Sequence, residues 1–180
     1  MKTLETERMI LRPFTMEDLE DFYQYCKMET VGPNAGWTPH KNRDESKRII
    51  EGFIEKGDVL AIYHRQDQLV VGSVGLHKKQ RSDGTVYHEV GYVLSTPYEG
   101  QGLMTEAVKR LLEYAFLDLN LPYLAVCHFV SNDKSRRVIE KCHFRFMGIG
   151  EHPTVSYGVR KSMEYELTRE QYLKTREEQK

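Results

Sequence analysis

Two glycines stand where a strand is expected to pass into a helix, a place where backbone N–H groups can bind phosphate. The strand-like run ends at Leu94, residues 98–102 read YEGQG, and apolar residues then recur at helical spacing. The first N–H groups of a helix lack partners within it and carry the positive end of the helix dipole, and glycine lets a ligand approach closely. Gly100 and Gly102 could therefore hold a phosphate group, although the pattern also fits a plain tight turn.

Two well-known phosphate-binding loops do not match this turn. A P-loop needs Lys and then Ser or Thr after its last glycine, where this chain has Leu103 and Met104. A dinucleotide-binding loop needs a third glycine, where this chain has Thr105, and a βαβ unit around it. The residues before the turn instead predict strands joined by short turns, at 59–64, 69–76 and 86–94. Such an antiparallel meander disfavours a nicotinamide-dependent oxidoreductase.

Cysteine and histidine stand side by side twice, which could suggest a thiol nucleophile with its base. The pairs are Cys127-His128 and Cys142-His143. Adjacent residues on a strand point to opposite faces, so Cys127 and His128 are not expected to pair. The seven histidines show no HExxH or other ligand spacing. We therefore expect no metal site and do not favour a covalent cysteine mechanism.

The composition predicts one globular domain that covers residues 1–180. Of these residues 39% are hydrophobic and 29% charged, and domains commonly hold about 100–200 residues. A net charge of -1 gives no basic excess for binding nucleic acid, and no apolar run reaches the ~20 residues that span a membrane. Three cysteines without CxxC spacing, and an N-terminus without a signal-peptide core, predict reduced thiols and a cytoplasmic location.

The elements before the glycine turn follow from capping signals and periodicity. A first strand at 9–14 leads through a capping box at Thr15 and Asp18 into a helix that ends near residue 28. A second helix at 44–56 should bury Ile49, Ile50, Phe53 and Ile54. Residues 29–43 between the two helices show no periodicity and contain the only tryptophan. That tryptophan, Trp37, could close the edge of the core or belong to a substrate loop.

The elements after the turn begin with the central helix, whose apolar face should run from Met104 to Leu119. A buried strand at 123–130 should follow, parallel to the strand that ends at Leu94 and joined to it by a right-handed crossover. A short helix capped by Asn132 or Asp133 comes next. The remaining predicted elements are a strand pair and a polar C-terminal helix, at 144–149, 157–167 and from 168 onward.

This order of elements resembles that of the GCN5-related N-acetyltransferase (GNAT) superfamily, in the style of its RimJ/RimL-like branch, which acetylates N-termini of ribosomal proteins. Four stretches carry the resemblance, and they are similar to the first strand, the fourth strand, the acetyl-CoA pyrophosphate loop and the Asn-x-x-Ser helix: 6–13, 89–94, 98–107 and 132–141. The resemblance implies an α/β (α+β) fold. Its central sheet would be mixed and mostly antiparallel, with a splayed parallel strand pair and helices on both faces.

Two positions depart from the pattern of the family. The first position of the loop is often Arg or Gln there, and this chain has Pro97, which matters little if the contacts come from backbone N–H groups. The family usually ends the later helix with Gly-Phe, and this chain has His143 before Phe144. A left-handed helix end costs more for His than for Gly, so the resemblance leaves the geometry after Cys142 open.

The resemblance implies acetyl-CoA as cosubstrate and places its parts on this chain. The pantetheine arm would pair with the strand backbone at Val93 and Leu94, and Asn132 would bond its amides. The pyrophosphate would lie on the turn and the first helical turn, with a hydroxyl from Thr105, on the backbone of Gly100, Gln101, Gly102, Leu103 and Met104. The outer phosphate would meet Arg136 or Arg137, of which Arg137 is our candidate. The alternative for both arginines is a solvated helix face.

The implied reaction is direct attack of a neutral amine on the thioester, with a strand N–H near Val93 or Leu94 stabilising the oxyanion. Glu89 shares a strand face with Val93 and is the candidate base, acting through water; a cross-strand ion pair is its alternative. Ser135 is the candidate acid or thiol-side hydrogen bonder, because the tyrosine often found in this region of the family is absent between 132 and 144. Its alternative is helix-surface hydrogen bonding.

The acceptor remains open at this level. Trp37, His40 and Tyr92 are candidates for the acceptor pocket. The amine partner could be a protein N-terminus, a lysine, a polyamine, or another small amine or antibiotic, and we expect neither nucleic acid nor membrane as partner. The protein could be a monomer or a homodimer. A different class also stays open, a non-catalytic module that senses acyl-CoA.

Overall fold

A computed structural model describes residues 1–178, and its centre is an eight-stranded sheet in the order β1-β2-β3-β4-β5-β6-β8-β7. The strands are β1 (Leu4–Glu5), β2 (Met9–Pro13), β3 (Val59–His64), β4 (Leu69–Gln80), β5 (Val86–Leu94), β6 (Tyr123–Phe129), β7 (Arg145–Pro153) and β8 (Val159–Thr168). The helices are α1 (Leu19–Cys26), α2 (Gly32–Ala35), α3 (Arg43–Lys56), α4 (Leu103–Glu113), α5 (Asp133–Lys141) and α6 (Arg169–Glu178). Neighbouring strands run antiparallel except β5 and β6, which are parallel. The expected mixed, mostly antiparallel sheet is confirmed.

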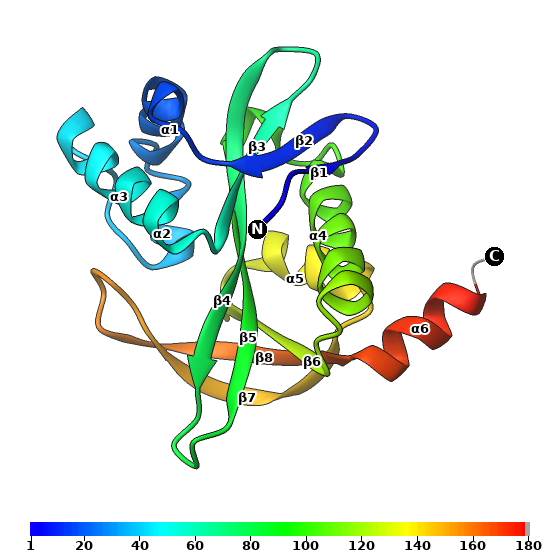
Figure 1. The fold of residues 1–180 in the computed structure, drawn as a ribbon. Helices are drawn as coiled ribbons and strands as arrows, with labels where there is room; N and C mark the ends of the chain where they lie inside the picture. The colour runs from blue at the N-terminus through cyan, green and yellow to red at the C-terminus, as the bar shows by residue number, and fades with distance from the viewer. Residues whose placement is uncertain (179–180) are drawn as a thin grey trace.

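Helices cover both faces of this sheet. Figure 1 shows α1, α2 and α3 on one side and α4 with α5 on the other. Strand β3 shows why both faces of the sheet must be covered by helices. Its residues Leu60 and Ile62 belong to a core with α4. The alternate residues Val59 and Ala61 belong to a second core with α1 and α3. Alternate residues of one strand point to opposite faces, so an apolar run such as β3 must be covered twice.

Most predicted elements are confirmed within a few residues. Strand β5 has the predicted bounds, and the capping box is present, because the Thr15 N–H donates to the Asp18 carboxylate at 2.8 Å. Strand β1 was not predicted, and residues 29–43 contain the one-turn helix α2. Only half of the predicted apolar face of α3 is covered. Ile50 is fully buried, but Ile49 and Ile54 are 40% and 45% exposed, because the covered face runs through Ser46 and Ile50.

The central helix does not continue as a regular α-helix to residue 119. After α4 the chain forms a π-helical turn, η3 (Tyr114–Asp118), whose hydrogen bonds span one more residue than those of an α-helix, as between the Leu119 N–H and the Tyr114 carbonyl. The extra residue rotates the following side chains, so Phe116 is fully buried while Leu119 is 43% exposed. The prediction that Leu119 lies in the core was therefore wrong. Among the helices of residues 1–178, none combines the length and apolar character that crossing a membrane requires.

Candidate active site

Strands β5 and β6 pair only at their beginnings and then separate. Their parallel register joins His88 to Leu124 and Glu89 to Ala125. Beyond that point β5 stays paired with β4 up to Leu94, and β6 stays paired with β8 up to Phe129. Each strand is thus held by its outer neighbour while the space between them opens. The expected splayed parallel pair is present.

The backbone of Leu94, rather than that of Val93, faces this opening. The N–H of Ser95 donates to the carbonyl of Val71 in β4 at 2.7 Å, so Ser95 faces β4. In an antiparallel ladder the backbone groups of every second residue face the same neighbour, so Val93 faces β4 as well. Tyr92 and Leu94 therefore direct their N–H and C=O groups toward the side from which β6 has departed. Of the two predicted pantetheine contacts, Leu94 has the available N–H.

The glycine turn lies at the mouth of the opening and leads into α4. Gly100 and Gly102 have φ angles of +76° and +80°, in the left-handed region that only glycine adopts at little cost. Gly102 occupies the N-cap position of α4, and because it has no side chain, the first N–H groups of the helix are left without a side-chain cap. The turn thus presents N–H groups at the positive end of a helix dipole.

A cavity of about 360 Å³ extends from the glycine turn along β5 to α5. Every predicted cofactor-side residue except one lines it: Val93, Leu94, Gly100, Gly102, Leu103, Met104, Thr105, Asn132 and Arg137. The exception is Gln101, whose side chain donates to the carbonyl of Pro97 and whose own carbonyl accepts from Arg8. Gln101 therefore shapes the turn from outside the cavity.

The two candidate arginines of α5 have different surroundings. Arg136 forms ion pairs with Asp133 and Glu140 along the helix surface, in agreement with a solvated helix face. Arg137 lines the cavity and has no ion-pair partner among residues 1–178. Lys134 and Lys141 also line it, and Lys134 pairs with Glu99. This end of the cavity is suited to an anion.

A second cavity, of about 520 Å³, lies on the other side of the parted strands. Its lining includes Trp37, His40, Tyr92 and Glu89, so the predicted acceptor residues and the candidate base are together. Trp37 also packs against the second core, so it closes the edge of that core and lines the cavity at the same time. The two cavities meet between β5 and α5, and they share Asn34, Ala35, Tyr92, Val93, Asn132 and Ser135.

His40 and Tyr92 are held by hydrogen bonds. The Nδ1 of His40 lies 2.8 Å from the Ser46 hydroxyl, and burial lowers the pKa of His40 more than the nearby Glu45 raises it, so the imidazole is neutral at pH 7. The hydroxyl of Tyr92 lies 2.8 Å from that of Ser135, at the junction of the two cavities. Burial raises the pKa of Tyr92 well above its usual value, so the phenol keeps its proton and can donate.

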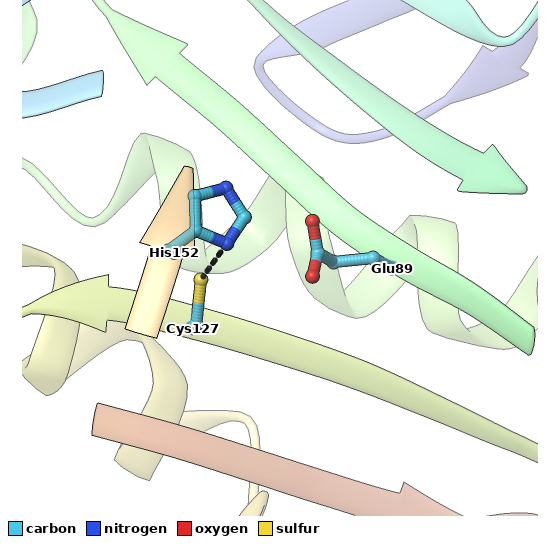
Figure 2. A group of neighbouring side chains, drawn as sticks. All are labelled: Glu89, Cys127 and His152. Carbon is cyan, nitrogen blue, oxygen red and sulfur yellow. Dashed lines mark hydrogen bonds between the residues drawn. The ribbon is translucent and has the colours of Figure 1, made fainter. Parts of the chain in front are cut away.

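Glu89 faces the second cavity with 17% of its side chain exposed, and its carboxylate lies 3.8 Å from the ammonium of Lys79. Figure 2 shows Glu89 beside Cys127 and His152, which come from β6 and β7. Cys127 contacts His152 at 3.5 Å and not its neighbour His128, which bonds Tyr165 instead. Burial, and then the charges of Glu89 and Glu164, raise the pKa of Cys127 to about 12, which disfavours a thiolate nucleophile.

Residues that flank α5 support this arrangement. Asn132 caps the helix, because its side-chain oxygen accepts from the Ser135 N–H at 3.1 Å. That bond leaves the amide NH₂ of Asn132, which reaches the carbonyl of Asn34 at 3.4 Å. At the other end, His143 adopts a φ of +64°, so the helix closes in the left-handed geometry even without glycine. The departure at this position leaves the expected geometry intact.

Comparison with known proteins shows which family this chain belongs to. Residues 8–145 match the model of the acetyltransferase (GNAT) domain. The chain belongs to the GNAT acetyltransferase family. Among curated relatives, the probable N-acetyltransferase YjcK of Bacillus subtilis is 33% identical over 87% of this chain and 91% of its own length. The putative ribosomal N-acetyltransferase YdaF of the same species is 36% identical over 43% of this chain and 42% of its own. The likeness to the RimJ/RimL-like branch is supported by that second relative.

Solved GNAT structures share the fold. An acetyltransferase of the GNAT family from Bacillus anthracis superposes with a TM-score of 0.82 at 20% identity, covering 93% of this chain and 99% of its own. The microcin C7 self-immunity acetyltransferase MccE, solved in complex with acetyl-CoA and AMP, gives a TM-score of 0.75 at 18% identity over 91% of this chain and 93% of its own. The mixed sheet of this GNAT chain is therefore the fold of its family.

Sequence reasoning missed two features of this GNAT site. The hydroxyl pair of Tyr92 and Ser135 joins a strand to a helix, so it has no local signal in the chain, although each residue was a candidate by itself. The lysines of the first cavity were also missed, since Lys134 and Lys141 read as an ordinary charged helix surface. Their spacing with Arg137, at i, i+3 and i+7, was the signal available for a common face.

Proposed function

We propose that residues 1–180 form one N-acetyltransferase domain that transfers an acetyl group from acetyl-CoA to a primary amine by direct attack in a ternary complex. The observation that carries this proposal is the meeting of two cavities where β5 parts from β6, at Tyr92, Val93 and Ser135. One cavity offers N–H groups and cations for a phosphorylated cosubstrate, and the other offers a carboxylate for an amine. The reacting atoms would meet at the junction.

On the cosubstrate side, this chain would bind acetyl-CoA mainly through backbone. The N–H groups of Gly102 and of the first turn of α4 are suited to the pyrophosphate, and Arg137 to an outer phosphate. Leu94 would donate its N–H to the thioester oxygen and stabilise the negative charge that develops there. The arm between these points would lie along the free edge of β5.

On the acceptor side, Glu89 would remove the proton of an ammonium substrate through a water molecule, since an amine must be neutral to attack. The ammonium of Lys79 lies 3.8 Å from this carboxylate and pairs with it. Ser135 and Tyr92 would act on acetyl-CoA, because one of their hydroxyls would donate a hydrogen bond to the departing CoA thiolate. Tyr92 suits this role because its raised pKa keeps the proton on the phenol.

The acceptor that we propose first is the N-terminal amine of a protein. Glu45 and Glu89 place two carboxylates in the lining of the second cavity, which favours a cationic amine. YdaF is named a putative ribosomal N-acetyltransferase, which makes the N-terminal sequences of ribosomal proteins the first peptides to try as acceptors. The three free cysteines fit a reducing compartment, and we propose that the protein acts in the cytoplasm.

Calorimetric titration with acetyl-CoA, with NADH and ATP alongside, tests the cosubstrate. Selective binding of acetyl-CoA is expected, and folded protein that does not bind it would refute the proposal at its root. An acceptor screen then follows, with release of the CoA thiol as readout. N-terminal peptides, lysine peptides and polyamines form separate arms, so turnover of polyamines alone would replace the N-terminal amine as acceptor.

The variant Glu89→Gln separates an enzyme from an acyl-CoA sensor. Turnover should fall at least about tenfold while acetyl-CoA affinity stays near that of the wild type, because Glu89 lines only the second cavity. Glu166→Gln is the matched control, since Glu166 is a strand carboxylate paired with Arg81 and lines neither cavity. Wild-type turnover in Glu89→Gln would remove Glu89 from the role of base.

A further inference from the structure

Three potential metal ligands converge between the parted strands and the last hairpin. Glu89 comes from β5, Cys127 from β6 and His152 from β7, and one ligand atom of each lies within 4.8 Å of the other two. Figure 2 shows the three side chains directed toward one another. They line the second cavity, so an ion could reach them.

The separations are close to those of a zinc site. With Zn–S near ~2.3 Å and Zn–N near ~2.0 Å, a tetrahedral ion holds its sulfur and nitrogen ligands about 3.5 Å apart. The Sγ of Cys127 and the Nδ1 of His152 are 3.5 Å apart. The Glu89 carboxylate lies within 4.8 Å of both atoms, so it would need to approach by at most about 1.5 Å to occupy a third corner of the tetrahedron.

The charges around the cluster favour a cation. The carboxylates of Glu89, within the cluster, and of Glu164, the register partner of Cys127 on β8, would attract a divalent ion to the Cys127 thiol. Lys79 opposes this attraction from 3.8 Å, but its side chain is 43% exposed and can turn into solvent. Gly150 in β7 leaves room for the Glu164 carboxylate beside the cluster, because a side chain at this position would collide with it.

We propose that Glu89, Cys127 and His152 bind a Zn²⁺ ion, and that the bound ion inhibits acetyl transfer. A Zn–S bond forms as Cys127 releases its proton to solvent, His152 supplies the lone pair of Nδ1, and Glu89 supplies a carboxylate oxygen. Three protein ligands leave the fourth position to water. The inhibition rests on the proposed function, because a carboxylate that holds zinc cannot accept a proton from the acceptor. This site departs from the expectation of no metal, which rested on spacing along the chain alone.

Cobalt absorption tests the binding without any acceptor or cosubstrate. Co²⁺ added to the metal-free full chain should produce a thiolate-to-cobalt charge-transfer band, and Zn²⁺ should abolish it by displacement. Cys127→Ser should lose the band and His152→Gln should weaken binding at least about tenfold. Cys142→Ser is the matched control, because Cys142 is buried outside the cluster and should leave the band unchanged. Thermal melts establish that each variant is folded.

Lys79→Met gives an independent test, because removing the opposing charge should tighten Co²⁺ binding roughly tenfold. A missing band in the wild type, or a band that persists in Cys127→Ser, would overturn the site. Inhibition by zinc is then measured for each variant as the ratio of its acetyl-transfer rates with and without Zn²⁺. In Cys127→Ser the two rates should be equal. Metal binding without inhibition would overturn the regulatory part. A protein that binds Co²⁺ but acetylates nothing would refute the proposed function and leave the site standing.

Discussion

Arg8 and Glu106 join the start of the chain to the first turn of α4. The guanidinium Nε of Arg8 donates to the Glu106 carboxylate at 2.7 Å, and the Arg8 backbone N–H donates to its other oxygen at 3.1 Å. The same guanidinium donates to the carbonyl of Gln101 at 2.9 Å. One side chain therefore ties the glycine turn to the helix that follows it.

Replacing Arg8 should weaken cosubstrate binding although Arg8 does not line the cavity. In Arg8→Ala the turn loses its tie to Glu106, so its N–H groups become less well ordered and acetyl-CoA affinity should fall about tenfold, or ~1.4 kcal/mol. Calorimetry measures the change. Arg65→Ala is the control, since Arg65 pairs with the exposed Glu5 away from both cavities. Equal affinity in Arg8→Ala and wild type would mean that the turn is ordered without this arginine.

Alanine variants of Gly100 and Gly84 distinguish the effect of backbone strain on stability from an effect on acetyl-CoA binding. Gly100 and Gly84 have φ angles of +76° and +88°, and a Cβ added to either would meet nothing within 4 Å. Alanine should therefore cost each protein about 1 kcal/mol of stability for the left-handed backbone. Only Gly100→Ala should also lower acetyl-CoA affinity, about tenfold or more, since Gly84 lies in the distant β4–β5 hairpin. Equal affinities of the two variants, measured by calorimetry, would contradict a phosphate site at this turn.

Sequence patterns predicted what local physics determines. Strand β5, the capping box of Thr15 and Asp18, and the glycine turn each depend on residues that are neighbours in the chain. The exposure of Leu119 could not be predicted, because a π-helical turn changes the register without a signal in apolar spacing. Contacts between strands far apart in the chain could not be predicted either. Cys127 contacts His152 because of the order of the strands in the sheet, for which the sequence carries no local signal.

The hydroxyls of Tyr92 and Ser135 should act as one unit. Because they are 2.8 Å apart, removing either should break the same hydrogen bond at the junction of the cavities. Tyr92→Phe and Ser135→Ala should each lower kcat about tenfold with little change in the KM for acetyl-CoA, and the double variant should be no worse than the poorer single one. Steady-state kinetics with the best acceptor measures this.

The control for Tyr92→Phe and Ser135→Ala is a second tyrosine of the same strand. Tyr87→Phe should keep the wild-type kcat, since Tyr87 also lies on β5 but stacks on Tyr123 and lines neither cavity. If the effects of Tyr92→Phe and Ser135→Ala multiplied in the double variant, the two hydroxyls would act independently. A rise in the KM for acetyl-CoA alone would assign them to cosubstrate binding rather than to the departing thiolate.

The pair of Arg12 and Asp18 should make stability depend on acid pH. The Asp18 carboxylate is 5% exposed and accepts two bonds from Arg12, at 2.7 and 2.8 Å. Burial raises the pKa of Asp18, but the bonds from Arg12 and from the Thr15 N–H outweigh it and hold the pKa below its usual value. A carboxyl whose pKa is lower in the folded state stabilises the fold above its unfolded pKa of ~3.9 and loses that contribution as the pH falls through the folded value.

Asp18→Asn should therefore lower the free energy of unfolding by about 1.5–3 kcal/mol at pH 7, since Asn keeps the shape but not the charge that Arg12 bonds. Urea unfolding as a function of pH measures this difference, which should shrink as the pH falls below about 4, where the Asp18 carboxyl of the unfolded chain begins to take up a proton while that of the folded protein stays charged. Glu20→Gln is the matched control, because Glu20 pairs with Arg43 on the exposed surface and should change stability little. A difference between Asp18→Asn and wild type that stayed constant down to the folded pKa would mean that packing of the side chain, and not its charge, stabilises this corner of the fold.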